Sequence, residues 1–168
     1  MSNMWFTSDQ HFDHANIINI CNRPFASLEE MQSQMIDRFN SVVKDNDTVF
    51  FLGDFSFVDP TPYLKLLKGK KKFVRGNHDH KHNLWPEESL LGSYAKLNVN
   101  HQKIIMCHYP IYDWDGKFKG SWHLYGHIHN NYVIKNGQCM NVGVDVNNFY
   151  PFSYDDVVVR MRSLQSQE

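Results

Sequence analysis

Histidine, aspartate and asparagine residues gather directly after short apolar runs in this sequence of 168 residues. Those with metal-binding or acid–base side chains are Asp9, His11, Asp54, Asn77, His78, His108, His127 and His129. Carboxylate and amide oxygens together with imidazole nitrogens suit Mn²⁺, Fe or Zn²⁺, and the absence of cysteine from the set argues against a structural zinc site. A single histidine of this kind is most simply a hydrogen-bonded structural residue, whereas the whole set predicts a catalytic metal centre.

The spacing within two of these motifs has a physical reason. Alternate side chains of an extended segment point to the same side, so Asp9 with His11, and His127 with His129, can each face one ion. Three of the candidate ligands directly follow a glycine. These glycines are Gly53, Gly76 and Gly126. Because glycine has no Cβ, we expect the backbone to turn sharply at these points and present the ligand that follows.

Apolar periodicity and turn signals predict the elements that hold these loops. Ser27 and Glu30 form a capping box, which satisfies the first free N–H groups of a helix. Short apolar or β-branched runs bounded by turn residues predict strands, and Asn136-Gly137 predicts a hairpin. The expected helices are 28–43 and 60–67; the expected strands are 4–8, 48–52, 72–74, 94–99, 103–107, 123–125, 132–135, 138–142 and 156–162.

The order of these elements predicts an α/β fold. Strand and helix alternate in the first half, while the second half is rich in strands, so we expect two mixed sheets flanked by helices in an αββα sandwich. Residues 1–168 are expected to form a single domain. Because α/β sheets bind ligands outside the carboxyl ends of their strands, the polar loops should meet at one edge of the fold.

The composition is that of an ordinary globular protein. Apolar residues make up 42% and charged residues 21% of the chain, and no low-complexity run suggests a linker. A formal net charge of -1 offers no basic surface for general binding of nucleic acid. Nucleic acid is therefore a partner that the charge does not indicate, although the sequence does not exclude it. Three separated cysteines, no signal-like segment and no apolar run of about 18 residues favour a cytoplasmic protein without a membrane partner. The oligomeric state stays open.

Five motifs occur in a fixed order: Asp-x-His at 9–11, Gly-Asp at 53–54, Gly-Asn-His-Asp at 76–79, a single histidine after a strand at 108, and Gly-His-x-His at 126–129. This order resembles that of the calcineurin-like metallophosphoesterases. Each motif alone is a weak signal, whereas five in order, each at a strand end, are specific. The resemblance implies the metallophosphoesterase fold, with a dinuclear metal site at the strand ends.

The resemblance also implies a role for each matching residue. Asp9, His11 and His129 would hold one ion, Asn77, His108 and His127 the other, and Asp54 would bridge the two. His78 would contact the substrate and protonate the leaving group. The implied cofactors are two divalent ions, with Mn²⁺ favoured and Fe, Zn²⁺ or Ni²⁺ as alternatives. They would activate a hydroxide that attacks phosphorus in line, without a covalent phospho-enzyme.

Formal charge favours a phosphodiester as the substrate. Two divalent cations, the carboxylates of Asp9 and Asp54 and one hydroxide sum to about +1, which matches the single negative charge of a diester. The protein-phosphatase branch of the family continues its Gly-Asp motif with Asp-Arg-Gly, whereas Phe-Ser-Phe-Val-Asp follows Asp54, which argues against that activity. We therefore expect a phosphodiesterase for a small, nucleotide-type phosphate ester. The alternatives are a phosphomonoesterase or nucleotide pyrophosphohydrolase and, less favoured because no expected ligand is missing, a non-catalytic binding module.

Two residues outside the motifs are candidates for substrate binding. His14 would share a face with His11 if a helix begins there, the alternative being a solvent-exposed histidine at the helix start. Arg23 is the only arginine near the first motif and is a candidate phosphate contact, the alternative being a surface arginine. Aromatic residues beside the motifs could stack on a base or pack in the core. They are Phe55, Phe57, Tyr109, Tyr112 and Trp114.

Overall fold

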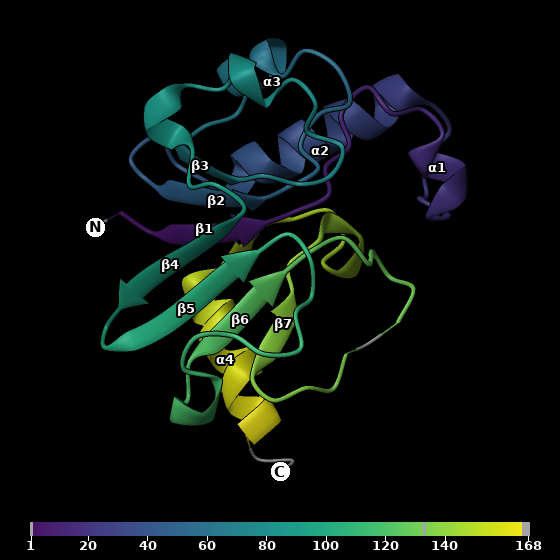
Figure 1. The fold of residues 1–168 in the computed structure, drawn as a ribbon. Coiled ribbons are helices and arrows are strands. Elements are labelled where there is room, and N and C mark those ends of the chain that lie inside the picture. Colours follow the sequence, from purple (N-terminus) through teal and green to yellow (C-terminus); the bar gives the residue numbers. More distant parts are fainter. Residues whose placement is uncertain (1, 133, 166–168) are drawn as a thin grey trace.

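Two four-stranded sheets form the framework of the computed structural model, which describes residues 2–132 and 134–165 (Figure 1). The first sheet has the order β3-β2-β1-β8, with β1 (Met4–Thr7), β2 (Thr48–Leu52), β3 (Lys70–Val74) and β8 (Phe152–Ser153). The second has the order β4-β5-β6-β7, with β4 (Tyr94–Val99), β5 (Gln102–Cys107), β6 (Trp122–Tyr125) and β7 (Cys139–Asn141). The predicted two-sheet α/β fold is confirmed.

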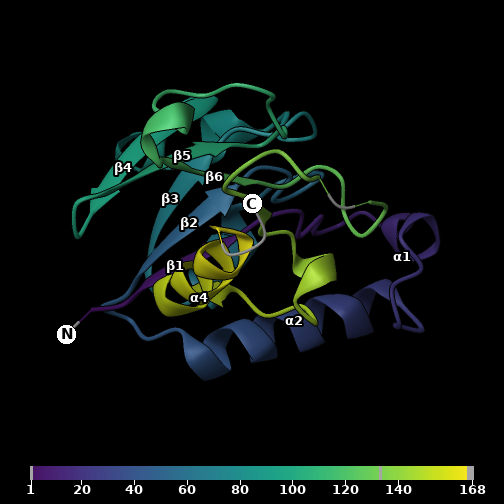
Figure 2. The same cartoon turned by 90° about the horizontal axis from the view of Figure 1, so that it is seen from below.

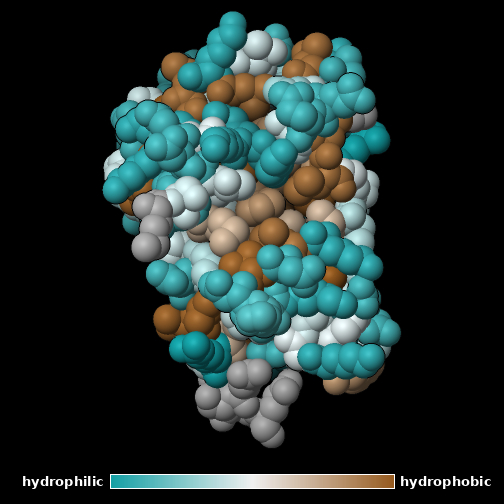
Figure 3. Space-filling view, turned by 90° about the vertical axis from the view of Figure 1, so that its left-hand side faces the viewer, coloured by the Kyte–Doolittle hydropathy of each residue, from teal (hydrophilic) through white to brown (hydrophobic). Residues whose placement is uncertain are grey.

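Strand direction brings the polar loops to one end of the fold. In the first sheet β1, β2 and β3 are parallel, and β8 pairs with β1 in the antiparallel sense. In the second sheet β5, β6 and β7 are parallel, while β4 and β5 form the predicted hairpin. The carboxyl ends of β1, β5 and β6 therefore face the right-hand side of Figure 1. The opposite face, at the amino ends of these strands, carries mostly hydrophilic side chains with scattered hydrophobic ones (Figure 3).

The helices cover the first sheet and close one side of the sandwich. They are α1 (Ile17–Ile20), α2 (Leu28–Val42), α3 (Thr61–Leu66) and α4 (Tyr154–Gln165), with single 3₁₀ turns at His82–Leu84, Glu87–Ser89, Lys117–Lys119 and Val144–Val146. The predicted cap of α2 is confirmed, because Ser27 Oγ accepts the Glu30 N–H at 3.1 Å. Met31, Met35 and Phe39 recur every fourth residue and bury one face of α2. The first sheet lies between α2 and the second sheet (Figure 2).

The central core lies between the two sheets. Phe6 and Leu52 from the first sheet meet Ile104 and Leu124 from the second, and all four side chains are fully buried. Burying each such side chain contributes roughly 1.5–3 kcal/mol, so this layer supplies much of the stability that holds the strand ends in register. Met161 of α4 joins the same cluster, so α4 packs at the side of the sandwich.

The segment predicted as a strand over 156–162 is instead part of helix α4, so that prediction was wrong. The β-branched run Val157 to Val159 suggested extended structure. A helix forms because Ser153 Oγ accepts the Asp156 N–H at 3.1 Å while an Asp156 oxygen accepts the Ser153 N–H at 2.9 Å, a reciprocal cap. Val157 and Met161, four residues apart, are both fully buried on one helix face.

The predicted strand at 132–135 and its hairpin are also wrong for the residues that can be described. Residues 132, 134 and 135 are irregular, and residue 133 lies outside the described part of the chain. The turn at Asn136-Gly137 leads instead into β7, which runs parallel to β6 with His123 opposite Cys139. A parallel neighbour cannot be reached by a two-residue hairpin, so the loop between β6 and β7 is long and begins with His127 and His129.

The outer face of the second sheet is covered by the loop between β5 and β6 and not by a helix. Trp114 in this loop packs with Ile105 and Tyr125. The fully buried His123 ties the loop to the sheet, since its Nε2 accepts the Ile111 N–H at 3.3 Å and its Nδ1 lies 3.3 Å from the Ile105 carbonyl oxygen. Among the described residues, no helix is long and apolar enough to cross a membrane.

Burial lowers the pKa of His123 to about 4 from its ordinary value near 6.5. The folded protein therefore resists a proton that the unfolded chain accepts, and stability should fall as the pH drops from 6.5 towards 4, by about 3 kcal/mol at most for this residue. His123→Gln should show a shallower pH dependence of the free energy of unfolding than the unmodified protein. His101→Gln, the same replacement at an exposed histidine, is the control variant. Equal slopes in all three proteins would contradict the assignment.

Candidate metal centre

Backbone hydrogen bonds align the loops that follow β1 and β2. The Asp9 N–H donates to the Gly53 carbonyl at 3.0 Å, and the His11 N–H donates to the Asp54 carbonyl at 3.0 Å. The chain therefore continues side by side beyond the ends of both strands. The two predicted motifs, separated in the sequence by α1 and α2, are fixed next to each other by these backbone hydrogen bonds.

The candidate ligands form two groups. In the first group Asp9, His11 and His129 each offer a ligand atom, and these atoms lie within 4.8 Å of one another. In the second, the same holds for Asp54, His108 and His127. Asn77 belongs with the second group, since its Oδ1 lies 2.9 Å from His108 Nε2. The structure thus brings the seven residues together in the grouping expected from the sequence, and their role as ligands stays a prediction.

Asp54 lies between the two groups. Its Oδ2 atom is 3.5 Å from Nε2 of His11 and 3.3 Å from Nε2 of His108. The other oxygen, Oδ1, accepts the backbone N–H of His78 at 2.8 Å. Burial by itself would raise the pKa of Asp54, but the hydrogen bonds from His108 and the His78 N–H lower it to about 2. A permanently ionised carboxylate therefore faces a histidine from each group.

The protein fixes which nitrogen of two histidines faces the centre. His108 Nδ1 lies 2.8 Å from the Leu52 carbonyl oxygen, and this contact directs Nε2 towards Asp54 and Asn77. His129 Nδ1 lies 2.8 Å from Asp145 Oδ2 in the same way. A carbonyl or carboxylate behind a histidine orients the ring and raises the basicity of the nitrogen that binds a metal.

The chemistry of these residues fits divalent cations. His11 Nε2 is buried and has no hydrogen-bond partner, although burying such an atom unpaired is costly. Burial lowers the pKa of His11 to about 2, so the ring is neutral, the form that binds metals. Burial also raises the pKa of Asp9 to about 6, which shows how poorly its charge is compensated by the protein alone. A cation at this point would satisfy both residues.

Five of the candidate ligand residues have an unusual backbone conformation. Asp9, His11, Asp54, His127 and His129 all have positive φ, between 50° and 71°. Residues other than glycine in this left-handed region cost of the order of 1–3 kcal/mol each and persist only where the surroundings enforce them. Strain of this kind concentrates at functional sites, and here it turns each side chain out of the strand direction towards the shared centre.

Two of the motif glycines are required by close packing and not by a turn. A Cβ on Gly76 would collide with the Asp54 side chain, and one on Gly126 would collide with the side chains of Ser8 and Asp9. Positive φ occurs only at Gly53 among the three motif glycines, with a value of 94°. The expectation of sharp turns therefore holds for one glycine, while the other two allow neighbouring motifs to approach each other.

Asp79, the last residue of the Gly-Asn-His-Asp motif, is a supporting residue that the sequence analysis did not single out. Its buried carboxylate accepts the backbone N–H groups of Asp54 at 2.8 Å, Phe55 at 2.8 Å and Gly76 at 2.7 Å. One side chain thereby joins the loop after β2 to the loop after β3. Its place in a ligand motif was the available signal.

Arg23 does not lie where a substrate contact requires it. Only 4% of the residue is exposed, and all five guanidinium N–H groups have partners. Two of them donate to Asp145, at 2.8 and 2.9 Å, and others donate to the carbonyl oxygens of Asp9 at 2.7 Å and Gln10 at 3.0 Å. The geometry therefore replaces the expected phosphate contact with a role in holding Asp9 and, through Asp145, His129.

Asp145 was missed because no motif contains it. With Cys21 and His129 it forms a third cluster of ligand-type atoms within 4.8 Å. Both of its oxygens already accept hydrogen bonds, Oδ1 from Arg23 and Oδ2 from Arg23 and His129. We read this cluster as support for His129 and not as a third ion site.

The aromatic residues near the motifs divide between core and surface. Phe55 and Trp114 are buried in hydrophobic clusters. Tyr112 is 84% exposed in the loop over the second sheet, and Tyr109 is 45% exposed with its ring 4.5 Å from that of His127. His14 and Phe57 lie beside His11 and His78 at the edge of the first group. A groove of about 500 Å³ between α4 and β7 is mainly apolar and holds none of the candidate ligands.

Comparison with known proteins gives relatives over most of the chain. The family model of the calcineurin-like phosphoesterase superfamily domain matches residues 3–145. An uncharacterized protein of Methanocaldococcus jannaschii is 35% identical over 169 residues, which cover 94% of this chain and 90% of that protein. The gene 66 protein of Mycobacterium phage L5 is 26% identical over 182 residues, covering 86% of this chain and 87% of the phage protein.

Solved structures show the same fold. A protein of unknown function from Aquifex aeolicus has a TM-score of 0.73 at 27% identity, covering 94% of this chain and 98% of its own. An archaeal phosphodiesterase has a TM-score of 0.50 at 18% identity, covering 84% of this chain and 83% of its own, which is a similarity of fold alone. From the family match over residues 3–145, the chain belongs to the calcineurin-like phosphoesterase superfamily and is a metal-dependent phosphoesterase.

Proposed function

We propose that the protein is a phosphodiesterase that hydrolyses a nucleotide-type substrate with two divalent cations. The observation that carries the proposal is the Asp54 carboxylate, whose Oδ2 faces His11 of one ligand group at 3.5 Å and His108 of the other at 3.3 Å. A carboxylate in this position could serve as a ligand of two neighbouring cations. The donor set of oxygens and imidazoles favours Mn²⁺, with Fe, Zn²⁺ and Ni²⁺ as alternatives.

The roles of the ligand residues follow from their groups. Asp9, His11 and His129 would hold one ion, and Asn77, His108 and His127 the other, with Asp54 shared. When bound, such ions polarise the phosphate and lower the pKa of a water to produce a nucleophile at neutral pH. The protein's own part is to keep His11 neutral by burial and to orient His108 through the Leu52 carbonyl.

His78 would act on the leaving group. Its backbone N–H is tied to Asp54, and its half-buried ring lies 5.4 Å from the ring of His11 without belonging to either ligand group. A histidine next to the reacting phosphate, yet free of the ions, can donate a proton to the departing alkoxide.

Charge favours a diester over a monoester. The arginine nearest to the first motif is Arg23, and its guanidinium is neutralised by Asp145. It therefore adds no net positive charge towards the phosphate, so a dianionic monoester would gain no compensation from this residue. A diester, with one negative charge, makes the smaller demand.

The Arg23–Asp145 ion pair would hold two ligands of the first ion in place. Asp145 accepts a hydrogen bond from His129 and forms an ion pair with Arg23. Arg23 also donates a hydrogen bond to the Asp9 carbonyl. Two ligands of one ion are thus braced by one buried pair, whereas His108 of the other group is braced separately by Leu52.

With Mn²⁺ present, we expect the purified protein to hydrolyse bis-p-nitrophenyl phosphate faster than p-nitrophenyl phosphate and to bind two ions per chain. Chelation by EDTA should abolish both activities, because the nucleophile depends on the ions. Elemental analysis and steady-state rates provide the measurement. Activity that survives complete removal of metal would refute the two-ion proposal, and faster hydrolysis of the monoester would refute the diester preference.

Two variants provide the matched comparison for this experiment. Asp54→Asn should weaken binding of both ions, since the shared carboxylate loses its charge. His11→Ala should mainly weaken binding of one ion, because His11 belongs to a single group. Equal loss of both ions in the two variants would argue against the shared position of Asp54.

The brace behind His129 can be tested by Asp145→Asn. We expect the affinity for one of the two ions to fall about 10- to 100-fold, the usual effect of removing a carboxylate that orients a metal-binding histidine, while the other ion binds normally. Calorimetric titration of the metal-free protein measures both affinities. Asp115→Asn is the control, because Asp115 pairs with Lys96 on the surface and should titrate like the unmodified protein. Unchanged affinities in Asp145→Asn would exclude the bracing role.

Replacement of His78 should separate catalysis from metal binding. His78→Ala should retain two ions and lose turnover within the range of general-acid catalysis, about 10²–10⁴-fold. The loss should be smaller with nitrophenolate as leaving group than with an alkoxide, because a weakly basic oxygen needs little protonation. The measurements are the metal content and kcat/KM for the two leaving groups, and together they show whether His78 acts as a general acid. A variant that has lost an ion would make His78 a ligand, and an equal deficit on both substrates would restrict it to binding the phosphate.

A further inference from the structure

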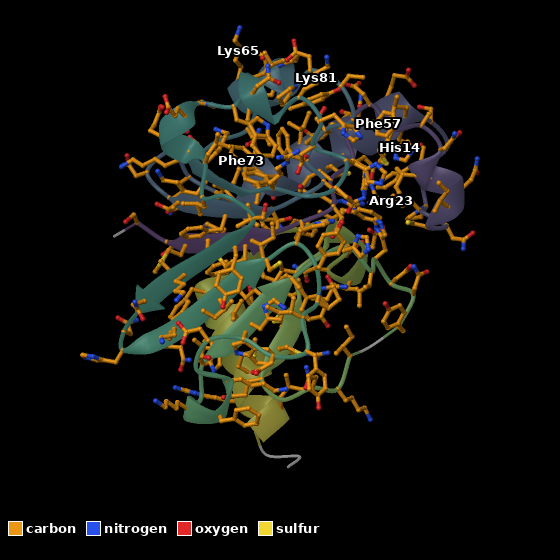
Figure 4. All side chains as sticks on the ribbon, viewed as in Figure 1. His14, Arg23, Phe57, Lys65, Phe73 and Lys81 are labelled. Atoms are coloured by element: carbon orange, nitrogen blue, oxygen red, sulfur yellow. The ribbon has the colours of Figure 1, made fainter. Side chains whose placement is uncertain are left out.

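Phe57 and His14 form a stacked pair of rings next to His78. Their ring centroids lie 4.5 Å apart and their planes differ by 12°. The ring of His78 is 5.8 Å from that of Phe57 and 6.1 Å from that of His14. Figure 4 shows Phe57 and His14 next to each other, above Arg23. An aromatic platform, defined as the rings of His14 and Phe57, therefore adjoins the residue proposed to protonate the leaving group.

The backbone holds this platform in a fixed place. The Phe57 N–H donates to the Phe12 carbonyl at 2.8 Å, and Ser56 forms a parallel bridge with Phe12. His14 is anchored from the other side, because its N–H donates to the His11 carbonyl at 3.1 Å. The backbone that carries the platform is thus tied to the same two loops as Asp54 and His11.

The platform remains open on the surface. Phe57 is 40% exposed and the next residue, Val58, is 45% exposed, although polar residues dominate the neighbouring ligand groups. His14 is half-buried, and its Nδ1 has no hydrogen-bond partner. An exposed apolar ring at the rim of a polar site, beside an unpaired nitrogen, is suited to a ligand that combines a planar face with hydrogen-bonding edges.

We propose that Phe57 and His14 bind the planar ring of the substrate's leaving group, and that this ring is a nucleobase. The proposal rests on the proposed function, because His78 marks the side from which the leaving group departs. Bases stack on aromatic side chains whatever their sequence, so the platform selects nucleosides as a class over plain alkyl esters. Tyr109 is not part of it, since its ring contacts His127 and His108 of the other ligand group.

The experiment compares a dinucleoside monophosphate with two abasic analogues that lack the base on one side or the other. Product analysis shows which nucleoside leaves without the phosphate, and the reacting bonds are the same in all three substrates. The unmodified protein with Mn²⁺ should show kcat/KM about 5- to 100-fold higher when the leaving nucleoside carries its base, the range that base stacking provides. Loss of the other base should have a smaller effect.

Phe57→Leu keeps apolar bulk but removes the ring. It should lower kcat/KM far more on the complete dinucleotide than on the analogue whose leaving nucleoside is abasic, and it should retain both ions. Phe118→Leu is the matched control, because Phe118 is 89% exposed in the loop that covers the second sheet. This variant should keep the preference for the leaving base.

The outcomes separate the two proposals. A Phe57→Leu variant that loses the same factor on all substrates, or that keeps the preference, would overturn the platform. So would an unmodified protein that cleaves bis-p-nitrophenyl phosphate with Mn²⁺ but shows no preference for a base on the leaving side. If the unmodified protein cleaves none of the diesters under these conditions, the proposed function itself falls.

Discussion

The geometry of the centre depends on the carboxylate of Asp54. One of its oxygens is fixed by the His78 N–H at 2.8 Å, so the other must face His11 and His108. The loop that carries Asp54 is held by Asp79, whose carboxylate accepts the Asp54 N–H at 2.8 Å. A displacement of this one side chain would therefore disturb the loops after β1, β2, β3 and β5 together.

This constraint explains why strain is tolerated at the centre. Positive φ at Asp9, His11 and Asp54 would each cost of the order of 1–3 kcal/mol, and hydrogen bonds between adjacent loops offset part of that cost. The remainder must come from the packed sheets behind the loops and from the ions when they bind, because ligands that bind only the folded state stabilise it. The stability of the metal-free protein should therefore come from its hydrophobic core, and binding of cations should add to it.

The sequence was informative wherever a local pattern determined the outcome. The cap at Ser27 and the strands that end before Asp9 and Asp54 follow from neighbouring residues, and the two-sheet fold follows from the order of the elements. The prediction for Val157 to Val159 was wrong because β-branched residues favour strands, whereas the cap formed by Ser153 and Asp156 starts a helix. Packing decided this segment: Val157 and Met161 are buried, whereas Val159, which a strand would place on the same face, is 69% exposed.

No local sequence pattern could show which side chains pair across long distances in the sequence. Arg23 and Asp145 are 122 positions apart, and nothing near either residue indicates that they meet in a buried ion pair. An isolated arginine beside a ligand motif suggests a phosphate contact, yet its partner is a carboxylate that arrives from beyond the last motif. The pairing also removes one positive charge from the side facing the substrate, so the ions become the main source of attraction for a phosphate. The structure thereby uses arginine to hold Asp9 and Asp145, and recognition of the substrate is what we propose for the ions and the residues around His78.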